Sequence, residues 1–332
     1  MALSAVSVCA FAPLDPRTYV PHELHSSERA WTESNCYIDV WVEILHALGL
    51  DPFACLPHVL PVDFDGDQWT FFKPSHDDLT VLYGLDVQEL NVWRPLVQNT
   101  REQLAGGKLV LSEVDAFYLP DTAGTDYRAQ HTKTTIGIQE LDIERRRLGY
   151  FHNSAYHRLE GADFVGLFHL ESAPDPTYMP FFAEFVRIDR LERLEPQALR
   201  SASVGVLRKH LQRLPRKNPV ARFSDRFPAD LAWMQSEGLA AYHAWAFATL
   251  RQLGAAFELG AFYVRWLSRA GETGLEPAAT AFDAISGASK TLILKTARAV
   301  NTKKPFDATG MLGDAARAWD AGMHLLVERY GA

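Results

Sequence analysis

The chain has 332 residues, of which 47% are hydrophobic and 22% are charged, values typical of a folded globular protein. This length allows one large domain or two ordinary ones. A formal net charge of −8 argues against a general nucleic-acid-binding protein. The three cysteines, Cys9, Cys36 and Cys55, have neither zinc-site spacing nor an even number for disulfide pairing. From this cysteine pattern we expect a cytoplasmic protein with reduced thiols and no bound metal. We also expect no membrane partner, because no apolar stretch reaches about 20 residues.

The most informative stretch begins at Cys36. Apolar residues recur at helical spacing over residues 36–48, and Gly49 then ends the predicted helix. Ser34 or Asn35 can cap this helix, because their short side chains accept hydrogen bonds from the first-turn N–H groups. Cys36 then lies in the first turn, where the helix dipole and free N–H groups favour an anion. These features predict a nucleophile; the alternative is a small buried residue of an amphipathic helix.

The rest of the chain divides by composition. Helical patterns over residues 75–83, 87–92 and 93–104 precede predicted strands at 108–120, 131–140 and 148–153, the last two joined by a charged turn. Residues 181–191 read as a connection. Five helical patterns follow, over residues 195–214, 228–253, 255–270, 277–301 and 310–330. The sequence thus predicts an α+β domain over residues 1–185 and a helical bundle over residues 186–332.

A cysteine on an early helix, a histidine opening a later strand and an amide after the next strand follow one another along the chain. Papain-like thiol enzymes use this order, since the histidine moves the thiol proton and the amide orients the imidazole. Cys36, His131 and Asn153 supply it here. His152 and Asp142 are alternatives to Asn153 as the orienting group. The fold expected from this order is a papain-like α+β domain.

Four sequence features together resemble a known family. Asn35-Cys36, the run Glu113–Pro120 (EVDAFYLP), Tyr127 and the strand-opening His131 are similar to the N-terminal domain of butirosin-acyltransferase-like proteins of papain fold. They also resemble a bacterial family catalogued as domain of unknown function 1839. The resemblance covers roughly residues 30–160.

The resemblance implies an enzyme that takes an aminoacyl group from the phosphopantetheine thioester of a carrier protein and passes it to an amine. No bound cofactor is implied beyond that phosphopantetheine arm. Cys36 would form the acyl-enzyme and His131 would be the general base. Ser34, Asn35, Asp115 and Tyr127 are candidates for oxyanion or substrate binding, with the alternative that Asp115 forms a structural ion pair.

Basic residues gather between positions 208 and 222. They are a candidate docking surface for an acidic acyl or peptidyl carrier protein, or else a solvated helix end. The residues concerned are Arg208, Lys209, Arg213, Arg216, Lys217 and Arg222.

The function expected from these features is transfer of an acyl group through Cys36 to a small-molecule or amino-acid amine. Two alternatives stay open. A cysteine peptidase or amidase would use the same residues with water as the acceptor. A non-catalytic module would use the same cleft only to hold a carrier protein or another ligand.

Overall fold

The computed structural model describes residues 7–172, 181–269 and 271–331, so residues 1–6 and 173–180 of the predicted first domain lie outside it. The chain forms two compact units. The first contains Met1–Ser26, Asn35–Asp51 and Leu79–Arg193, and the second contains Ser27–Ser34, Pro52–Asp78 and Leu194–Ala332. The division is therefore not a single cut at residue 185, because two early segments belong to the helical unit.

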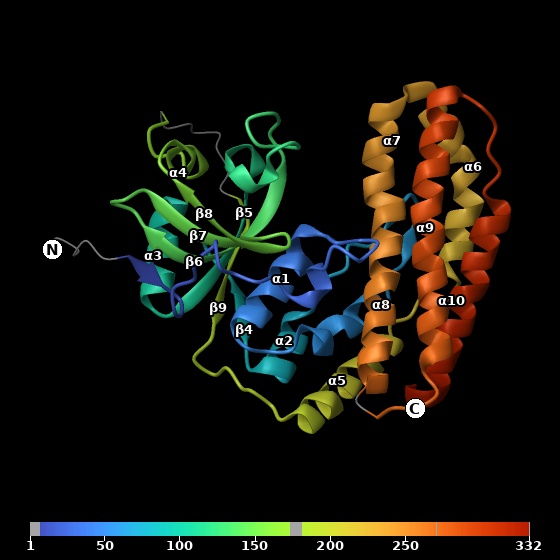
Figure 1. The fold of residues 1–332 in the computed structure, drawn as a ribbon, viewed down its shortest axis with the longest axis horizontal. Helices are drawn as coiled ribbons and strands as arrows, with labels where there is room; N and C mark the ends of the chain where they lie inside the picture. The colour runs from blue at the N-terminus through green and yellow to red at the C-terminus, as the bar shows by residue number, and fades with distance from the viewer. Residues whose placement is uncertain (1–6, 173–180, 270, 332) are drawn as a thin grey trace. The chain divides into compact units, whose positions relative to one another are not determined.

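The first unit is built on an antiparallel sheet, as Figure 1 shows. In the described residues seven strands pair, in the order β4-β9-β5-β6-β7-β8 with β1 added beside β6. Their bounds are Val8–Cys9 for β1, Asp86–Glu89 for β4, Lys108–Asp115 for β5, Lys133–Asp142 for β6, Arg147–His152 for β7, Ala155–Glu160 for β8 and Ala183–Arg187 for β9. The predicted antiparallel pairing of the strands near 131–140 and 148–153 is confirmed, with Gly137 opposite Phe151.

Helices pack against the central strands of this sheet. Helix α1 (Cys36–Ala47) contacts β6 and β7, and α3 (Leu96–Ala105) contacts β5 and β6. All but the first residue of β6 are buried, as expected for a strand covered on both faces, and in Figure 1 the sheet lies between α1 and α3. Gly137 of β6 makes room for α1, because a Cβ there would lie 2.8 Å from Cδ1 of Ile44.

Two segments of the sheet were not predicted as strands. Residues 87–92 have a helical apolar pattern, yet Asp86–Glu89 forms β4. Likewise, residues 181–191 read as a connection, yet Ala183–Arg187 forms β9 and pairs with both β4 and β5. Pairing between segments about a hundred residues apart decides both cases, and short windows of sequence carry no signal for it.

Short elements complete the first unit. The 3₁₀ turn η1 (Glu23–His25) precedes α1. Two further 3₁₀ turns follow β5, namely η3 (Ala116–Tyr118) and η4 (Pro120–Thr122). Helix α4 (Ala162–Leu167) follows β8. The two-residue turn Asn153-Ser154 joins β7 to β8.

The second unit is helical. Helix α9 (Glu276–Thr302) packs against α8 (Gln252–Arg269) and α10 (Thr309–Tyr330), and α10 also contacts α6 (Pro219–Glu237), as the yellow-to-red ribbons of Figure 1 show. The remaining elements are α5 (Pro196–Leu211), α7 (Leu239–Ala246), the π-helical segment η5 (Phe247–Arg251), the 3₁₀ segment η2 (Pro52–Val59) and the hairpin of β2 (Phe64–Asp65) and β3 (Gln68–Trp69). Helix α2 (His76–Tyr83) crosses the division between the units.

The helix predicted from residue 228 begins nine residues earlier. Pro219 is the first residue of α6, and Asn218 caps the helix by accepting hydrogen bonds from the N–H groups of Val220 and Ala221. Pro228, read as a helix start, lies inside α6 instead. An Asn-Pro pair is a good start signal, since proline needs no first-turn partner for its nitrogen.

Candidate active site

Cys36 lies where the sequence predicts it. It is the first residue of α1, and Asn35 is the N-cap residue with an extended backbone. The Asn35 side-chain oxygen accepts hydrogen bonds from the N–H groups of Tyr37 and Ile38, both at 3.1 Å. Ser34, the alternative cap, is buried next to it. Asn35 thus takes up the N–H groups of Tyr37 and Ile38, and the backbone N–H of Cys36 lies at the start of the same turn, beside the thiol.

The Cys36 side chain is half-buried and contacts the sheet. Its sulfur lies 3.7 Å from the hydroxyl oxygen of Thr135 in β6. Glu113 is directly opposite Thr135 on β5, which places its carboxylate on the same face of the sheet as the thiol's neighbour. Lys133 pairs with that carboxylate. The surroundings of the thiol are thus polar, with a hydroxyl and an ion pair on the facing strands.

His131 is held by two neighbours. Its Nδ1 lies 2.6 Å from the carboxylate of Asp115, and its ring stacks on Phe117 at a centroid distance of 4.4 Å and an angle of 16°. The other Asp115 oxygen accepts a hydrogen bond from the N–H of Phe117 at 3.0 Å. With Nδ1 bonded to a carboxylate, Nε2 is the ring nitrogen left to exchange a proton. The His131 side chain is 68% exposed, so a substrate can reach it.

Asn153 lies in the turn between β7 and β8, and the contacts of the described side chains include none between Asn153 and His131. Asn153 has a φ of 47°, in the left-handed region that two-residue hairpin turns require, and asparagine adopts this conformation more readily than most residues. The other two alternatives are also engaged elsewhere. His152 binds Asp121 and Thr134, and Asp142 accepts a hydrogen bond from the N–H of Arg145.

The carboxylate that contacts the His131 ring in the structure is therefore that of Asp115. The reason lies in the strand register, because Asp115 is opposite Lys133, two residues after His131. The sequence order of papain-like enzymes points to a later strand and misses this neighbour. Asp115 was singled out in the sequence only as a substrate-binding or structural carboxylate.

Cys36 contacts strand β6, whereas His131 lies two residues before this strand begins. The thiol contacts Thr135, four residues after His131, a separation of about 13 Å along an extended chain. The contacts of the described side chains include none between the thiol and the imidazole. The structure therefore brings together His131 with Asp115, and Cys36 with Thr135, as two neighbouring pairs.

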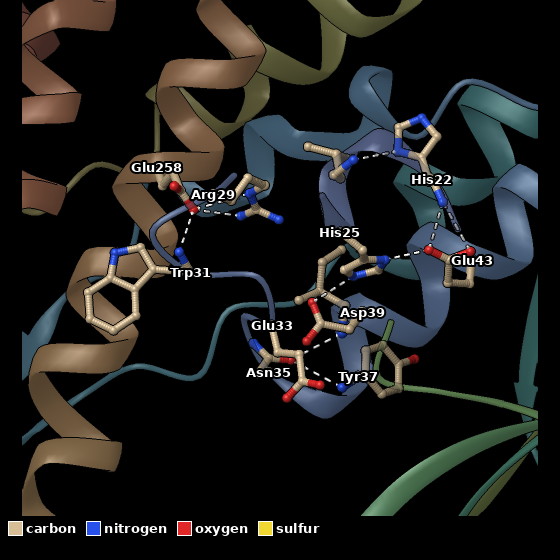
Figure 2. Close-up of polar contacts among 12 residues, drawn as sticks. His22, His25, Arg29, Trp31, Glu33, Asn35, Tyr37, Asp39, Glu43 and Glu258 are labelled. Atoms are coloured by element: carbon tan, nitrogen blue, oxygen red, sulfur yellow. Dashed lines mark hydrogen bonds and ion pairs between the residues drawn. The ribbon is translucent and has the colours of Figure 1, made fainter. Parts of the chain in front are cut away.

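A buried ionic cluster lies against α1, as Figure 2 shows. His25 of η1 pairs through Nδ1 with the Glu43 carboxylate, and its Nε2 lies 3.4 Å from Asp39. Glu43 also accepts hydrogen bonds from the Tyr19 hydroxyl and, at 3.1 Å, from the N–H of His22. Burial opposes the charged imidazole, but the hydrogen bonds and charges of the two carboxylates outweigh it and raise the pKa of His25 to about 9. The cluster thus fastens residues 19–25 to α1.

The residues before the cap belong to the helical unit. There the Glu258 carboxylate accepts hydrogen bonds from the Arg29 guanidinium at 2.8 Å (Figure 2) and from the N–H of Ala30 at 2.9 Å. The indole of Trp31 donates to the Ser286 hydroxyl at 2.9 Å. A Cβ at Gly254 would lie 2.3 Å from the Trp31 ring, so this glycine makes room for the indole. The segment that leads to Cys36 is therefore fixed within the helical unit.

A second hydrogen-bonded chain involves β6 and β7. The Thr134 hydroxyl lies 2.8 Å from Nε2 of His152, and Nδ1 of His152 lies 2.5 Å from Asp121. The Tyr150 hydroxyl donates to the other Asp121 oxygen at 2.5 Å. Burial raises the pKa of Asp121, but the hydrogen bond and charge of His152 outweigh burial and lower it. The chain attaches η4, in the segment between Asp115 and His131, to the sheet.

Tyr127 and the basic residues of the helical unit were the remaining predicted site residues. The Tyr127 hydroxyl donates to Asp163 at 3.0 Å. Lys209 pairs with Asp78, and Arg222 pairs with Asp63. The other four basic residues predicted as a docking surface are exposed: Arg208, Arg213, Arg216 and Lys217.

The part of the chain that the structure describes has neither a metal-binding cluster nor a membrane-spanning helix. Among the described side chains, no three of His, Cys, Asp or Glu gather in a way that could hold a metal ion. Within the same residues, every helix is too short or too polar to cross a lipid bilayer.

Fold and site define a two-part protein, with a cysteine-headed helix on an antiparallel sheet and a separate helical unit. Family models match both parts: the DUF1839 N-terminal domain over residues 20–188 and the DUF1839 C-terminal domain over residues 196–328. The chain belongs to the DUF1839 family, which confirms the family predicted from the sequence. A comparison with curated proteins finds no similar sequence.

Proposed function

We propose that this protein is a cysteine-dependent acyl or aminoacyl transferase with a papain-like arrangement of its site. The observation that carries the proposal is that a capped, cysteine-headed helix and a histidine held by a carboxylate lie beside the same sheet, although their side chains do not contact each other. A thiol at a helix start and an oriented imidazole are the two parts that thiol acyl-transfer chemistry needs. The family models match residues in both units, but their descriptions name no reaction.

In the proposed reaction His131 takes the proton of the Cys36 thiol, and the thiolate attacks the carbonyl of a phosphopantetheine thioester. The bond from that carbonyl carbon to the donor sulfur breaks, and the donor leaves as a thiol with the proton from His131. An amine then attacks the carbonyl carbon of the Cys36 thioester and gives a proton to His131. The bond from that carbon to the Cys36 sulfur breaks, the product leaves as an amide, and the Cys36 thiolate takes the proton back from His131. Exchange between two thioesters changes the bond type little, so amide formation supplies the driving force.

Asp115 supports this cycle by keeping the proton on Nδ1 of His131, which leaves Nε2 free to act as the base. The proposed oxyanion donors are the backbone N–H of Cys36 and the side chain of Asn35 or Ser34. His131 must approach Cys36 when the donor binds, since the two side chains contact different points of the strand.

The donor in this proposal is an acyl or peptidyl carrier protein. The exposed cations Arg208, Arg213, Arg216 and Lys217 are its proposed docking residues, because carrier proteins of this kind are acidic and exposed charges steer association. Lys209 and Arg222 already pair with carboxylates and contribute less. Replacing the four exposed cations by glutamine is expected to slow carrier-protein-dependent acylation and leave acylation by free thioesters unchanged.

Intact-mass spectrometry tests the transferase. Incubation with an aminoacyl-phosphopantetheine thioester is expected to add one hydroxylamine-labile aminoacyl group to the wild type and none to Cys36→Ala. Release of free acid with water as the acceptor would favour a hydrolase that uses the same residues. No adduct with any thioester, together with a thiol inert to iodoacetamide, would favour a non-catalytic binding module.

A further inference from the structure

Arg128 lies on the segment that carries His131, in an unusual conformation. Its φ is 55°, in the left-handed region that residues with side chains rarely adopt. A hydrogen bond from its N–H to the carbonyl of Phe117, at 3.0 Å, holds the backbone there. Residues kept in such conformations by their surroundings cluster at ligand-binding and catalytic sites, which directs attention to the side chain.

The Arg128 guanidinium lies among aromatic rings. It is 5.4 Å from the ring centre of Phe117 and 5.5 Å from those of Tyr118 and Tyr127. Phe117 is also the ring on which His131 stacks. The aromatic surface therefore places a permanent cation beside the proposed general base, and such surfaces leave a guanidinium poorly hydrated and available for an anion.

The Arg128 guanidinium forms an ion pair with one carboxylate, that of Asp163. Asp163, at the start of α4, pairs with the Arg128 guanidinium and accepts the Tyr127 hydroxyl. The Asp163 side chain is only 15% exposed, whereas that of Arg128 is 43% exposed. A guanidinium has five N–H donors in a planar fork, so one ion pair leaves donors for a second oxyanion on the exposed side.

We propose that Arg128 binds the phosphate of the phosphopantetheine donor; this inference rests on the proposed function. His131 is four residues before Thr135, the contact of Cys36, which corresponds to about 13 Å along an extended chain, and Arg128 shares the Phe117 ring with His131. The phosphate of such a donor is separated from its thioester by the long pantetheine arm. The acyl group of the donor must reach the Cys36 thiol, whereas its phosphate lies at the other end of the arm. Arg128, which lies beside His131 and apart from the thiol, therefore fits the phosphate better than the acyl group. Bidentate recognition of phosphate is the contact for which arginine is best suited.

Rates of Cys36 acylation by two small donors test this site. The donors are a glycyl-phosphopantetheine thioester and the glycyl-pantetheine thioester that lacks the phosphate. Wild type is expected to react about tenfold to a hundredfold faster with the phosphorylated donor at low concentration, the range for one or two charge-assisted hydrogen bonds. Arg128→Gln is expected to react with both donors at the slower rate. An unchanged preference in Arg128→Gln would overturn the proposal, as would a wild type without any preference.

Two further variants separate phosphate binding from a structural role. Asp163→Asn removes the same ion pair but keeps Arg128, so it should retain the preference for the phosphorylated donor. If Asp163→Asn loses the preference as Arg128→Gln does, the ion pair acts by ordering the segment and the proposal fails. Arg146→Gln is the matched control, because Arg146 also has a left-handed backbone, with φ of 50°, and an exposed ion pair with Glu171. It should behave as the wild type.

A binding measurement keeps this inference separate from the proposed function. S-methyl phosphopantetheine, which carries no acyl group, should protect Cys36 from iodoacetamide at lower concentration than S-methyl pantetheine does, and Arg128→Gln should abolish the difference. If no thioester acylates Cys36 but this difference is found, the transferase fails and the phosphate site stands. If acylation occurs without any effect of the phosphate, the phosphate site fails and the transferase stands.

Discussion

The buried ion cluster of His25, Asp39 and Glu43 predicts how stability depends on pH. The pKa of His25 rises from the ordinary value of 6.5 to about 9 in the folded protein. Because the folded state binds this proton more tightly, the stabilisation is fully present below pH 6.5 and is lost as the pH rises through about 9. For this almost completely buried imidazole the shift corresponds to about 3 kcal/mol of stabilisation.

Urea unfolding of the wild type and of His25→Gln at pH 6 and pH 10 measures this contribution. The free-energy difference between the two proteins is expected to shrink by about 3 kcal/mol between the two pH values. Comparing the proteins at each pH cancels groups that titrate in both. Glu43→Gln, which leaves Asp39 as the only carboxylate beside His25, should show a smaller pH-dependent part than the wild type. A difference between wild type and His25→Gln that is equal at both pH values would refute the reasoning.

Three substitutions test the placement of other residues. Asp115→Asn should slow acylation of Cys36 at least about tenfold, because an amide does not hold His131 in one tautomer as a carboxylate does; an unaffected rate would remove Asp115 from the site. Asn153→Gly should leave the acylation rate unchanged and the unfolding free energy within about 1 kcal/mol, because glycine readily adopts its left-handed conformation; a large loss of rate would restore Asn153 as a catalytic candidate. Gly137→Val should lower the unfolding free energy by about 2 kcal/mol or more in urea titration, since its side chain meets Ile44 of α1; wild-type stability would contradict that close packing.

Local signals in the sequence were sufficient for the helix that carries the nucleophile. The start of α1, a cap at Ser34 or Asn35 and the position of Cys36 in the first turn were predicted, because capping and apolar periodicity act within a few residues, and the structure has the cap at Asn35. The hairpin of β6 and β7 was predicted for a similar reason, since a charged turn separates two apolar runs.

Distant contacts account for what was missed. Asp115 reaches His131 through the register of two strands, whereas the order of residues in papain-like enzymes pointed to Asn153. The cluster around His25 joins a loop to a helix about 15 residues later, and nothing local marks a histidine as buried between two carboxylates. The strand β4 was read as helix because its partner β9 lies about a hundred residues away. In each case tertiary pairing overrides the local pattern.

The central claim is that His131 activates Cys36, although the two side chains contact different partners in the structure. Its most direct test is the single-turnover rate of Cys36 acylation by an aminoacyl-phosphopantetheine thioester, measured by intact mass in wild type, His131→Gln and His243→Gln. His243 is an exposed histidine of the helical unit and serves as the matched control. The account predicts a rate at least about a hundredfold lower in His131→Gln and an unchanged rate in His243→Gln. Acylation of His131→Gln at the wild-type rate would contradict it.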